Sequence, residues 1–390
     1  MLEKAFTGGK AYKRWMGFLI LLVIGGSLSY MQQFKYGLGI TGMSRDISWG
    51  VYISQFTFLV GVAASAVMLV LPYYLHDYKT FGKIVILGEM LAVSAIVMCL
   101  TFIMADLGKP MRALNVLIHP TPNSILFWDM VVLNGYLFLN LLCGFVAMES
   151  ERTDTAPPKW IKPFIYLSIP WAVSIHTVTA FLYAGLPARH YWLTAIMAPR
   201  FLASAFAGGP ALLILLALIV RKFTGFDAGK AAIQKLAVIV TYAALLNAFF
   251  VGLEVFTSFY SNIPGHKSTF QYLWQGIDGH GNLVPFMWTS GILGVISIVM
   301  LLFPKIRQDE TKLAWACVML FISLWIDKGI GLVIGGFVPN MLEQVTEYHA
   351  TGLEIMITVG IWALGFLILS ALYKVAIDIK LSKKGIETPH

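Results

Sequence analysis

Residues 84–105 read IVILGEMLAVSAIVMCLTFIMA, and residues 106–112 continue as DLGKPMR. A helix of about 22 residues rises about 33 Å, which matches the hydrocarbon thickness of a bilayer. The run carries a single charged residue, Glu89, and a polar motif follows it directly. These features predict a membrane-spanning helix that ends at one face of the membrane, beside a loop of unusual composition.

The composition of the whole chain extends this interpretation to a polytopic membrane protein. Of its 390 residues, 58% are hydrophobic and only 12% are charged, and the mean hydropathy is +0.76. A soluble globular chain is usually about 25% charged, so this chain has too little polar surface for a water-soluble body of its size. The formal net charge of +8 does not indicate nucleic-acid binding, because the basic residues lie in short loops between apolar runs.

Apolar runs of this kind recur along the chain, and we expect an all-α protein with about ten transmembrane helices in one integral membrane domain, residues 1–390. The predicted spans are 15–32, 48–74, 84–105, 125–148, 163–184, 201–220, 236–259, 284–303, 313–334 and 351–373. The first follows basic residues, as a secretory signal would. No A-x-A-like cleavage site comes after it, so we take it as the first span.

The distribution of basic residues predicts the orientation of these spans. Of the 28 Lys and Arg residues, twenty lie at the two ends of the chain or in the loops of that same side. The opposite side holds Lys35, Arg45, Lys109, Arg112, Arg189, Arg200 and Lys267, and Lys328 lies within a span. The positive-inside rule then places both termini in the cytoplasm, in a multi-pass protein of the cytoplasmic (inner) membrane.

A weak internal repeat divides the spans into two groups. Spans two to five align with spans six to nine, and FLVGVAASA from Phe58 resembles FLASAFAGG from Phe201. Both groups enter the membrane from the same side, which predicts two parallel four-helix bundles, residues 48–184 and 201–334. The first and the last span are then peripheral helices, one at each end of the chain.

Seven ionisable side chains fall inside the predicted spans, most of them at mid-membrane or nearer the outer face. They are Glu89, Asp129, His176, Glu254, Asp327, Lys328 and Glu354. A charged group at mid-membrane costs at least about 2.5–3.5 kcal/mol on insertion scales, so each requires a partner or has a function. The simpler interpretation is a hydrogen bond between helices; for Lys328 it is a carboxylate partner or an extended side chain that reaches the interface. A series of titratable groups that reaches one face is more typical of proton handling.

The sequence offers no ligand set for a metal cofactor. A membrane haem with two axial histidines needs both inside helices, and only His176 is placed deep in a span. The other histidines lie in loops, at span ends or in the tail: His76, His119, His190, His266, His280, His349 and His390. Cys99, Cys143 and Cys317 each lie alone in an apolar segment, and zinc, P-loop and EF-hand motifs are absent. We therefore expect this chain to bind no haem, no iron–sulfur cluster and no metal of its own.

Three stretches resemble the NrfD/PsrC family of membrane quinone-reactive subunits. They are WGVY at 49–52 with FLVG at 58–61, DLGKPMR at 106–112 with PNS at 122–124 and Trp128, and RHYW at 189–192 with PRF at 199–201. The deep histidine, His176, agrees with the family too. Ten spans with cytoplasmic termini resemble the longer branch, such as DsrP and HmeB, rather than the eight-span polysulfide reductase anchor.

The resemblance implies a quinol oxidoreductase activity that the chain has as a subunit of a complex. Menaquinone or menaquinol would bind near the outer membrane face, and a ferredoxin-like, DsrO-like iron–sulfur subunit outside the cytoplasm would exchange the electrons. Cytochrome c and further membrane and cytoplasmic redox subunits would complete a complex of dissimilatory sulfur metabolism. The outer connections are rich in Trp, Tyr, His, Pro and Gly, as expected of a surface on which such a partner docks.

The expected chemistry needs few residues, because quinol oxidation requires a base within hydrogen-bond reach of a quinol hydroxyl. Carboxylates and a histidine in low dielectric suit this task. The expected catalytic residues are His176, Asp327, Glu254 and Asp129. The expected rim of the quinone pocket is Asp106, Arg112 and Trp128, with the alternative that Arg112 only pairs with Asp106. The expected proton path is Glu89 and Glu354.

Two other classes of function remain open at this point. A proton-coupled secondary transporter or channel would move its substrate without a partner subunit, and helices broken at mid-membrane would favour it. The Gly and Pro sites at 208–210 and 335–336 lie closer to the ends of the predicted spans. A purely structural membrane anchor is opposed only by the buried ionisable groups.

Overall fold

The computed structural model describes residues 3, 5, 7–75 and 79–382, and within these ranges ten helical segments are long and apolar enough to cross a membrane. They are α1 (Lys10–Tyr36), α2 (Val51–Ala64) with α3 (Val67–Leu75), α4 (Val85–Asp106), α6 (Ile125–Thr153), α7 (Lys162–Ala184), α8 (Met197–Thr224), α9 (Lys230–Tyr260), α11 (Val284–Leu302), α13 (Glu310–Leu324) with η7 (Trp325–Gly331) and α14 (Leu332–Gly335), and α15 (Gly352–Ser382). The prediction of an all-helical polytopic membrane protein is confirmed.

Shorter helices lie in the connections: α5 (Asn115–Ile118), α10 (Pro264–Trp274) and α12 (Pro304–Gln308). Local chemistry sets where the long helices begin and end. Asp309 caps α13, because its side chain accepts from the backbone N–H groups of Thr311 and Lys312 at 3.1 and 3.2 Å. Gly225 ends α8 with a φ of 70°, which a residue without Cβ adopts freely. His76 and His390 lie outside the described residues.

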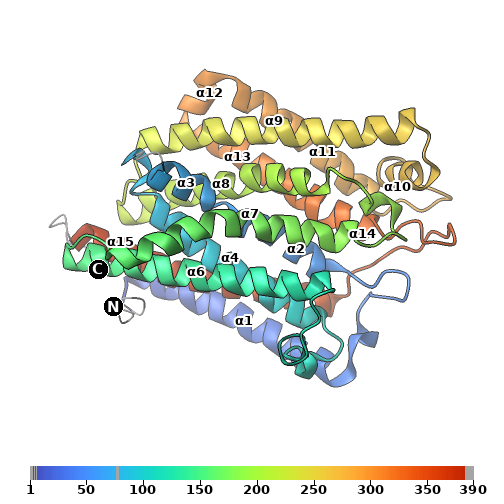
Figure 1. The fold of residues 1–390 in the computed structure, drawn as a ribbon, viewed down its shortest axis with the longest axis horizontal. Helices are drawn as coiled ribbons and strands as arrows, with labels where there is room; N and C mark the ends of the chain where they lie inside the picture. The colour runs from blue at the N-terminus through green and yellow to red at the C-terminus, as the bar shows by residue number, and fades with distance from the viewer. Residues whose placement is uncertain (1–2, 4, 6, 76–78, 383–390) are drawn as a thin grey trace.

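The spans run side by side along the long axis of the molecule (Figure 1). The start of α1 and the end of α15 lie at the same end, and α10 lies at the opposite end. We call the end with α10 the α10 end. An even number of crossings is therefore present in the fold. That the α10 end faces the outside of the cell stays a prediction.

The second span is interrupted between α2 and α3, at Ser65. The Ser65 hydroxyl donates to the carbonyl of Val62 at 2.6 Å, and the backbone of Gly209 in α8 approaches so closely that a Cβ there would lie 2.1 Å from the Ser65 Cβ. Because α8 extends from Met197 to Thr224, Pro210 lies near its middle. The expectation that the glycine and proline at 208–210 lie near a span end is therefore wrong.

The ninth span contains the π-helix η7. Such elements are rare and are frequently found at functional sites. The first residue of η7, Trp325, donates to the Gln55 side chain of α2 at 2.8 Å. Two glycines let η7 lie between neighbouring helices: a Cβ on Gly329 would lie 3.0 Å from the Ser54 carbonyl oxygen, and one on Gly331 would lie 2.6 Å from the Met287 sulfur. Packing against α2 and α11 thus accompanies this departure from α-helical geometry.

The helix α2 lies at the centre of the packing, and every residue in it except Val51 is buried. It contacts α4, α7 and α8 as well as η7. The two terminal spans pack against each other, with Gly26 of α1 so close to Gly360 of α15 that a Cβ would lie 2.6 Å from the other Cα. The division into two parallel four-helix bundles stays a prediction.

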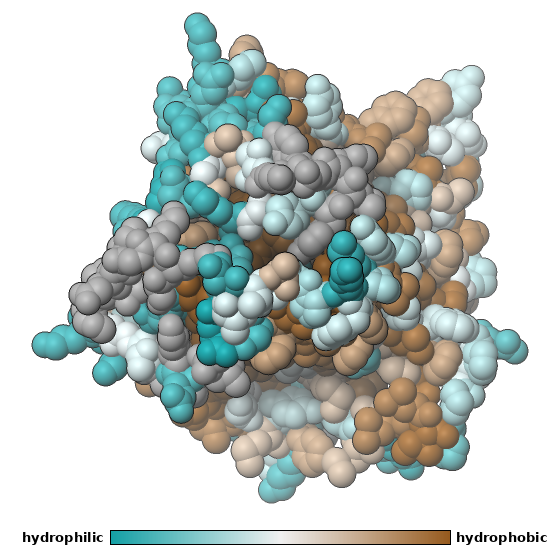
Figure 2. Space-filling model, turned by 60° about the vertical axis from the view of Figure 1, so that its left-hand side comes forward, coloured by the Kyte–Doolittle hydropathy of each residue, from teal (hydrophilic) through white to brown (hydrophobic). Residues whose placement is uncertain are grey.

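The surface agrees with insertion in a bilayer. Figure 2 brings the end with the start of α1 forward, and hydrophilic side chains gather over part of that end while the flank to its right is largely hydrophobic. The apolar side chains on the flanks include Phe18 and Leu21 of α1 and Phe249 of α9, each more than half exposed. In a bilayer these side chains contact lipid.

Candidate functional site

Three charged side chains from three different spans meet in the half of the molecule toward the α10 end. Arg200 of α8 donates to both carboxylate oxygens of Asp327 in η7, at 3.0 and 2.9 Å, and forms a second ion pair with Glu254 of α9. Arg200 is only 5% exposed and Glu254 8%. We call Arg200, Glu254 and Asp327 the Arg200 centre.

The Arg200 centre holds α8, α9 and the ninth span together, and its formal charge is negative because it has two carboxylates and one guanidinium. The apolar pattern predicts that Arg200 lies in an outer loop, since the uninterrupted run begins at Phe201. This prediction is wrong: α8 begins at Met197, so Arg200 lies within the span. Pro199 was the available signal, because proline is tolerated in the first turn of a helix.

A second polar group joins α6 to α7. Thr179 donates to the carboxylate of Asp129 at 2.7 Å, and Asp129 is 2% exposed. His176 lies about one turn away on α7 and is fully buried, yet neither ring nitrogen has a hydrogen-bond partner in the described part of the chain. Buried polar groups are usually satisfied by protein or water. An unsatisfied imidazole therefore marks a position at which a water molecule or a ligand completes the site.

Lys328 follows Asp327 of the Arg200 centre directly and contacts Phe201, the residue after Arg200. Its ammonium donates to the carbonyl oxygen of Phe201 at 3.3 Å and lies 4.3 Å from the centre of the Phe201 ring. The side chain is 4% exposed, so it does not reach the interface, and among the described residues it forms no ion pair. The sequence suggested that Lys328 either pairs with a carboxylate or extends to the membrane interface, and both interpretations are therefore wrong.

Packed aromatic rings close the α10 end of this region. The Trp192 ring lies 5.7 Å from Trp49, 5.1 Å from Tyr183 and 5.0 Å from Phe337 between ring centres. Trp192 and Tyr183 are fully buried, and Gly336 allows the contact because a Cβ there would lie 2.1 Å from the indole nitrogen of Trp192. A ligand that reached His176 past Tyr183 would have to displace this cluster.

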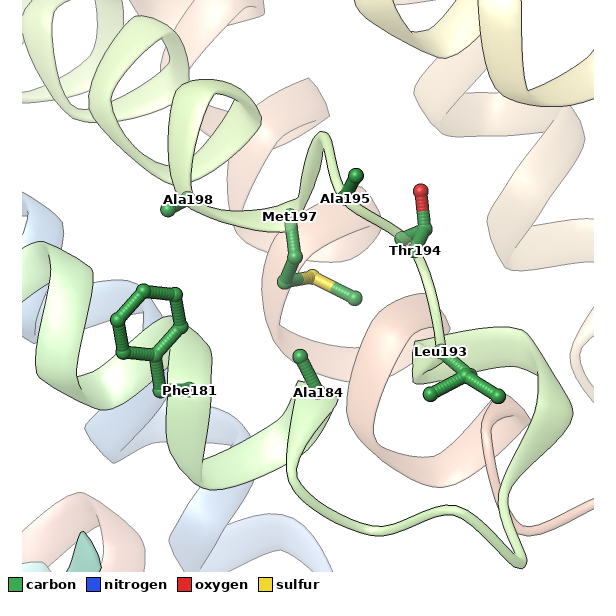
Figure 3. A pocket seen from close by; sticks show the side chains of 7 residues that line it. All are labelled: Phe181, Ala184, Leu193, Thr194, Ala195, Met197 and Ala198. Atoms are coloured by element: carbon green, nitrogen blue, oxygen red, sulfur yellow. The ribbon is translucent and has the colours of Figure 1, made fainter.

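An apolar cavity of about 340 Å³ lies between the end of α7 and the start of α8 (Figure 3). It is lined by Phe181, Ala184, Leu193, Thr194, Ala195, Met197 and Ala198. Figure 3 shows the Met197 side chain extending into the space between the two segments. Phe181 is 50% exposed on the flank of its helix, where lipid would lie. A mainly apolar cavity with one hydroxyl, that of Thr194, suits a hydrophobic ligand that arrives through the bilayer.

Among the described residues, no hydrogen bond or ion pair joins the three expected rim residues to one another. At the end of α4, one carboxylate oxygen of Asp106 is buried without a hydrogen-bond partner. Arg112 is exposed and, among the described residues, makes no ion pair with Asp106. Trp128 is 47% exposed and donates its indole N–H to the carbonyl of Pro122 at 2.8 Å.

The two residues expected in a proton path lie in different settings. Glu89 of α4 is 4% exposed, and one of its carboxylate oxygens has no partner in the described chain. Glu354 is fully buried and accepts from Gly42 N–H at 2.8 Å, Thr351 N–H at 2.8 Å and Tyr348 O–H at 2.7 Å. Glu354 thus joins the connection after α1 to the segment before α15, whereas Glu89 keeps an unused acceptor.

Outside the spans, Glu347 joins two loops at the α10 end. Its carboxylate accepts from Asn282 N–H at 2.8 Å and from Tyr272 O–H at 3.3 Å, and it lies 3.3 Å from His280 Nδ1. Burial alone would raise the pKa of Glu347, but the hydrogen bonds from Asn282, His280 and Tyr272 outweigh it and hold this pKa below its ordinary value.

No group of three or more His, Cys, Asp or Glu side chains in the described ranges is arranged to hold a metal ion. Cys99, Cys143 and Cys317 are buried and free. The functional groups of this region are therefore carboxylates, one imidazole, one amine and one guanidinium. Together they can exchange protons and stabilise charge.

Comparison with known proteins identifies relatives along most of the chain. A Halobacterium salinarum protein, provisionally named as a membrane subunit of dimethyl sulfoxide reductase, is 25% identical, covering 93% of this chain and 91% of the relative. A selenate reductase subunit of Mesobacillus selenatarsenatis is 23% identical, with 92% of each covered. The Hdr-like menaquinol oxidoreductase integral membrane subunit of Archaeoglobus fulgidus is 22% identical, covering 83% of this chain and 80% of the relative.

A family description, "Polysulphide reductase, NrfD", matches residues 39–338. The match begins in the connection after α1 and ends just after α14, so it includes eight of the ten spans and every residue of the Arg200 centre. All three relatives are named as subunits of reductases or oxidoreductases, and two of them as membrane subunits. The chain belongs to the NrfD family of membrane subunits of oxidoreductase complexes.

Proposed function

We propose that this chain is the quinone-reactive membrane subunit of a respiratory redox complex. It oxidises menaquinol, or reduces menaquinone, and exchanges the electrons with a ferredoxin-like iron–sulfur subunit. The observation that carries this proposal is His176, a fully buried imidazole with two unpartnered nitrogens on the same helix that lines the apolar cavity. The name of the Archaeoglobus relative, a menaquinol oxidoreductase subunit, supports the choice of substrate.

Each group of the site receives a role from its surroundings. His176 accepts the proton of a quinol hydroxyl, because it is the buried imidazole without another partner. Asp129 is the next acceptor, because Thr179, which donates to its carboxylate, lies about one turn from His176 on α7. Asp327 and Glu254 are already bound to Arg200, so we assign them the electrostatic setting of the site and not the role of free base.

The remaining parts of the proposal concern the surroundings of the chain. Both termini lie in the cytoplasm, the protein lies in the cytoplasmic membrane, and the loops of the α10 end form the docking surface for the iron–sulfur subunit. Glu89, with its unpartnered oxygen, belongs to a proton path toward the opposite face. The complex would serve dissimilatory sulfur metabolism, as the resemblance to DsrP and HmeB implies.

Substitution in the cavity tests whether quinone uses it. Ala184→Trp fills the cavity between α7 and α8, and we expect the KM for menaquinol to rise about tenfold or more in the purified complex, as loss of uniform binding predicts. The matched control is Ala248→Trp, at an exposed position of α9, which leaves KM unchanged. Equal KM values for both variants would show that quinone does not pass through this cavity.

A proton-coupled transporter is the second candidate, because two interruptions within spans favour it. The break at Ser65 lies against Gly209 in the middle of α8, and η7 packs on α2, as in transporters whose broken helices surround the site. The test is proton or substrate flux into liposomes that contain this chain alone. Flux that needs no quinol and no partner would favour the transporter over the redox subunit.

A further inference from the structure

Asp327 and Lys328 are consecutive residues that contact different parts of the protein. Asp327 binds Arg200 at the start of α8, whereas Lys328 contacts the Phe201 carbonyl and ring and lies against Gly61 of α2. Both belong to η7, whose geometry adds a residue to the turn and redirects the side chains that follow. The π-helix therefore places an amine in the interior, between Phe201 of α8 and Gly61 of α2.

The amine of Lys328 is poorly matched to a permanent positive charge. An ammonium has three N–H donors, and Lys328 makes one hydrogen bond, at 3.3 Å, to a backbone carbonyl. Its cation–π contact with Phe201 is a weaker contribution. A buried charge normally has an ionic partner, and no carboxylate of the described residues lies within ion-pair distance of this one. A neutral amine leaves no unpaired charge at this position.

The neighbouring charges also tolerate the protonated form. The Arg200 centre has an excess of one negative charge, and one oxygen of Glu254 has no hydrogen-bond partner. A proton on Lys328 makes the whole group neutral. The Phe201 ring, against which the Lys328 ammonium lies, also packs on Tyr183 of α7 at 5.9 Å between ring centres. The titratable His176 is buried about two turns from Tyr183 on that helix, and Cys99 is buried in α4. Both protonation states of the amine are thus accommodated, which suits a group that gains and loses a proton.

We propose that Lys328 is a proton-exchanging residue that links His176 to the Arg200 centre during quinol turnover, which rests on the function proposed above. When quinol is oxidised, both of its O–H bonds break: one proton forms an N–H bond on His176, and the other forms an O–H bond on the carboxylate of Asp129. No hydrogen bond within the described chain joins His176 to Lys328, so the imidazolium N–H breaks toward a bridging water molecule. That water passes a proton on, and a new N–H forms on the neutral amine of Lys328. The two electrons leave to the iron–sulfur partner subunit, so Lys328 itself is neither oxidised nor reduced.

Two substitutions separate proton exchange from a fixed charge. Lys328→Arg keeps a positive charge and donors for the Phe201 carbonyl, but arginine does not give up its proton in a protein. Lys328→Met removes both. We expect each variant complex to bind the quinol-analogue inhibitor HQNO within about threefold of the parent and to lose about 10²-fold of its single-turnover quinol oxidation rate. The pH profile of that rate should also lose one inflection in both.

Controls distinguish the ways in which this proposal can fail. Lys222→Arg and Lys222→Met alter an exposed lysine in the last turn of α8, at the end opposite α10, and should retain the parent rate and pH profile. Turnover of Lys328→Arg within about twofold of the parent, with the parent pH profile, would show that a fixed cation suffices and would overturn the proposal. If Lys328→Met does not assemble, Lys328→Arg alone still distinguishes proton exchange from a fixed positive charge. Absence of saturable HQNO binding in the parent complex would instead overturn the proposed function itself.

Discussion

The Arg200 centre and the pair His176 and Lys328 are both buried in the bilayer region, but they differ in how their polar atoms are satisfied. Arg200 binds carboxylates of two other spans. Among the residues that the structure describes, His176 has no hydrogen-bond partner, and Lys328 has one, a backbone carbonyl. Paired charges contribute to holding helices together, because breaking a buried pair is costly. Unpaired groups contribute little to stability, so their presence is better explained by a reaction. The comparison therefore separates structural from reactive groups within one region.

Removing Arg200 should have the largest effect on the folded protein. Arg200→Met leaves Glu254 and Asp327 buried without their cation, and we expect a loss of about 3–5 kcal/mol. The measurement is the yield and thermal midpoint of the detergent-solubilised chain. Arg112→Met is the matched control, because Arg112 is exposed and forms no ion pair among the described residues. Equal stability of the two variants would show that the Arg200 centre is not structural.

His176→Leu should have the opposite effect, a loss of activity without a loss of stability. No hydrogen bond within the described chain is lost, so the thermal midpoint should stay near that of the parent, whereas quinol oxidation should fall by about 10²–10⁴-fold. Steady-state turnover of the purified complex and its thermal midpoint are measured together. His119→Leu, at an exposed position, should leave the thermal midpoint unchanged. A strong loss of stability in His176→Leu would place His176 with the structural groups instead.

Gly61→Ala tests whether the position of Lys328 matters. The added Cβ would lie 3.2 Å from the Lys328 ammonium and 3.5 Å from the Cα of Ala205, so the flexible amine must move by a few tenths of an ångström. We expect turnover to fall about threefold, with stability changed by about 1 kcal/mol or less. Gly252→Ala, where nothing lies within 4 Å of the added Cβ, is the control. Identical turnover of the two variants would show that a small displacement of the Lys328 amine does not affect turnover.

The smallest effect is expected outside the membrane, at Glu347. Its pKa is held below the ordinary value of 4.5, so its contribution to stability is present above that value and is lost as the pH falls through the lower folded pKa. The amide of Asn282 should stay protected from hydrogen exchange at pH 5–7, after correction for the intrinsic rate, and lose protection in Glu347→Gln. Equal protection of the parent and Glu347→Gln at pH 7 would contradict this role.

Much of the fold could be predicted from the sequence, because a membrane span is set by length and apolarity alone. The fourth, fifth and eighth spans begin within one residue of their predicted starts. The main error concerned Arg200, since an arginine at the edge of an apolar run looks like the end of a span. Its pairing with Glu254 and Asp327 depends on residues 54 and 127 positions away, and hydropathy carries no information on such contacts.

The local environment of the site residues could be predicted only in part. His176, Asp129, Glu254 and Asp327 are found buried or largely so, as the cost of charge in a bilayer indicates. The isolation of His176 could not be foreseen, because it depends on what the neighbouring helices do not offer. No residue preference predicts a π-helix from the sequence. Gly329 leaves room for α2 to pack against η7, and this role is recognisable only once the packing of the two helices is known.

The measurement that tests the central claim most directly is a fluorescence-quench titration of the purified complex with HQNO, run on the parent, on His176→Ala and on Arg112→Met. The account predicts saturable binding by the parent and by Arg112→Met, and an affinity about tenfold or more lower in His176→Ala, as expected when a buried hydrogen-bond partner is lost. Equal affinity in all three complexes would contradict the assignment of His176 to the quinone site. Absence of saturable binding in an intact parent complex would contradict the quinone site altogether.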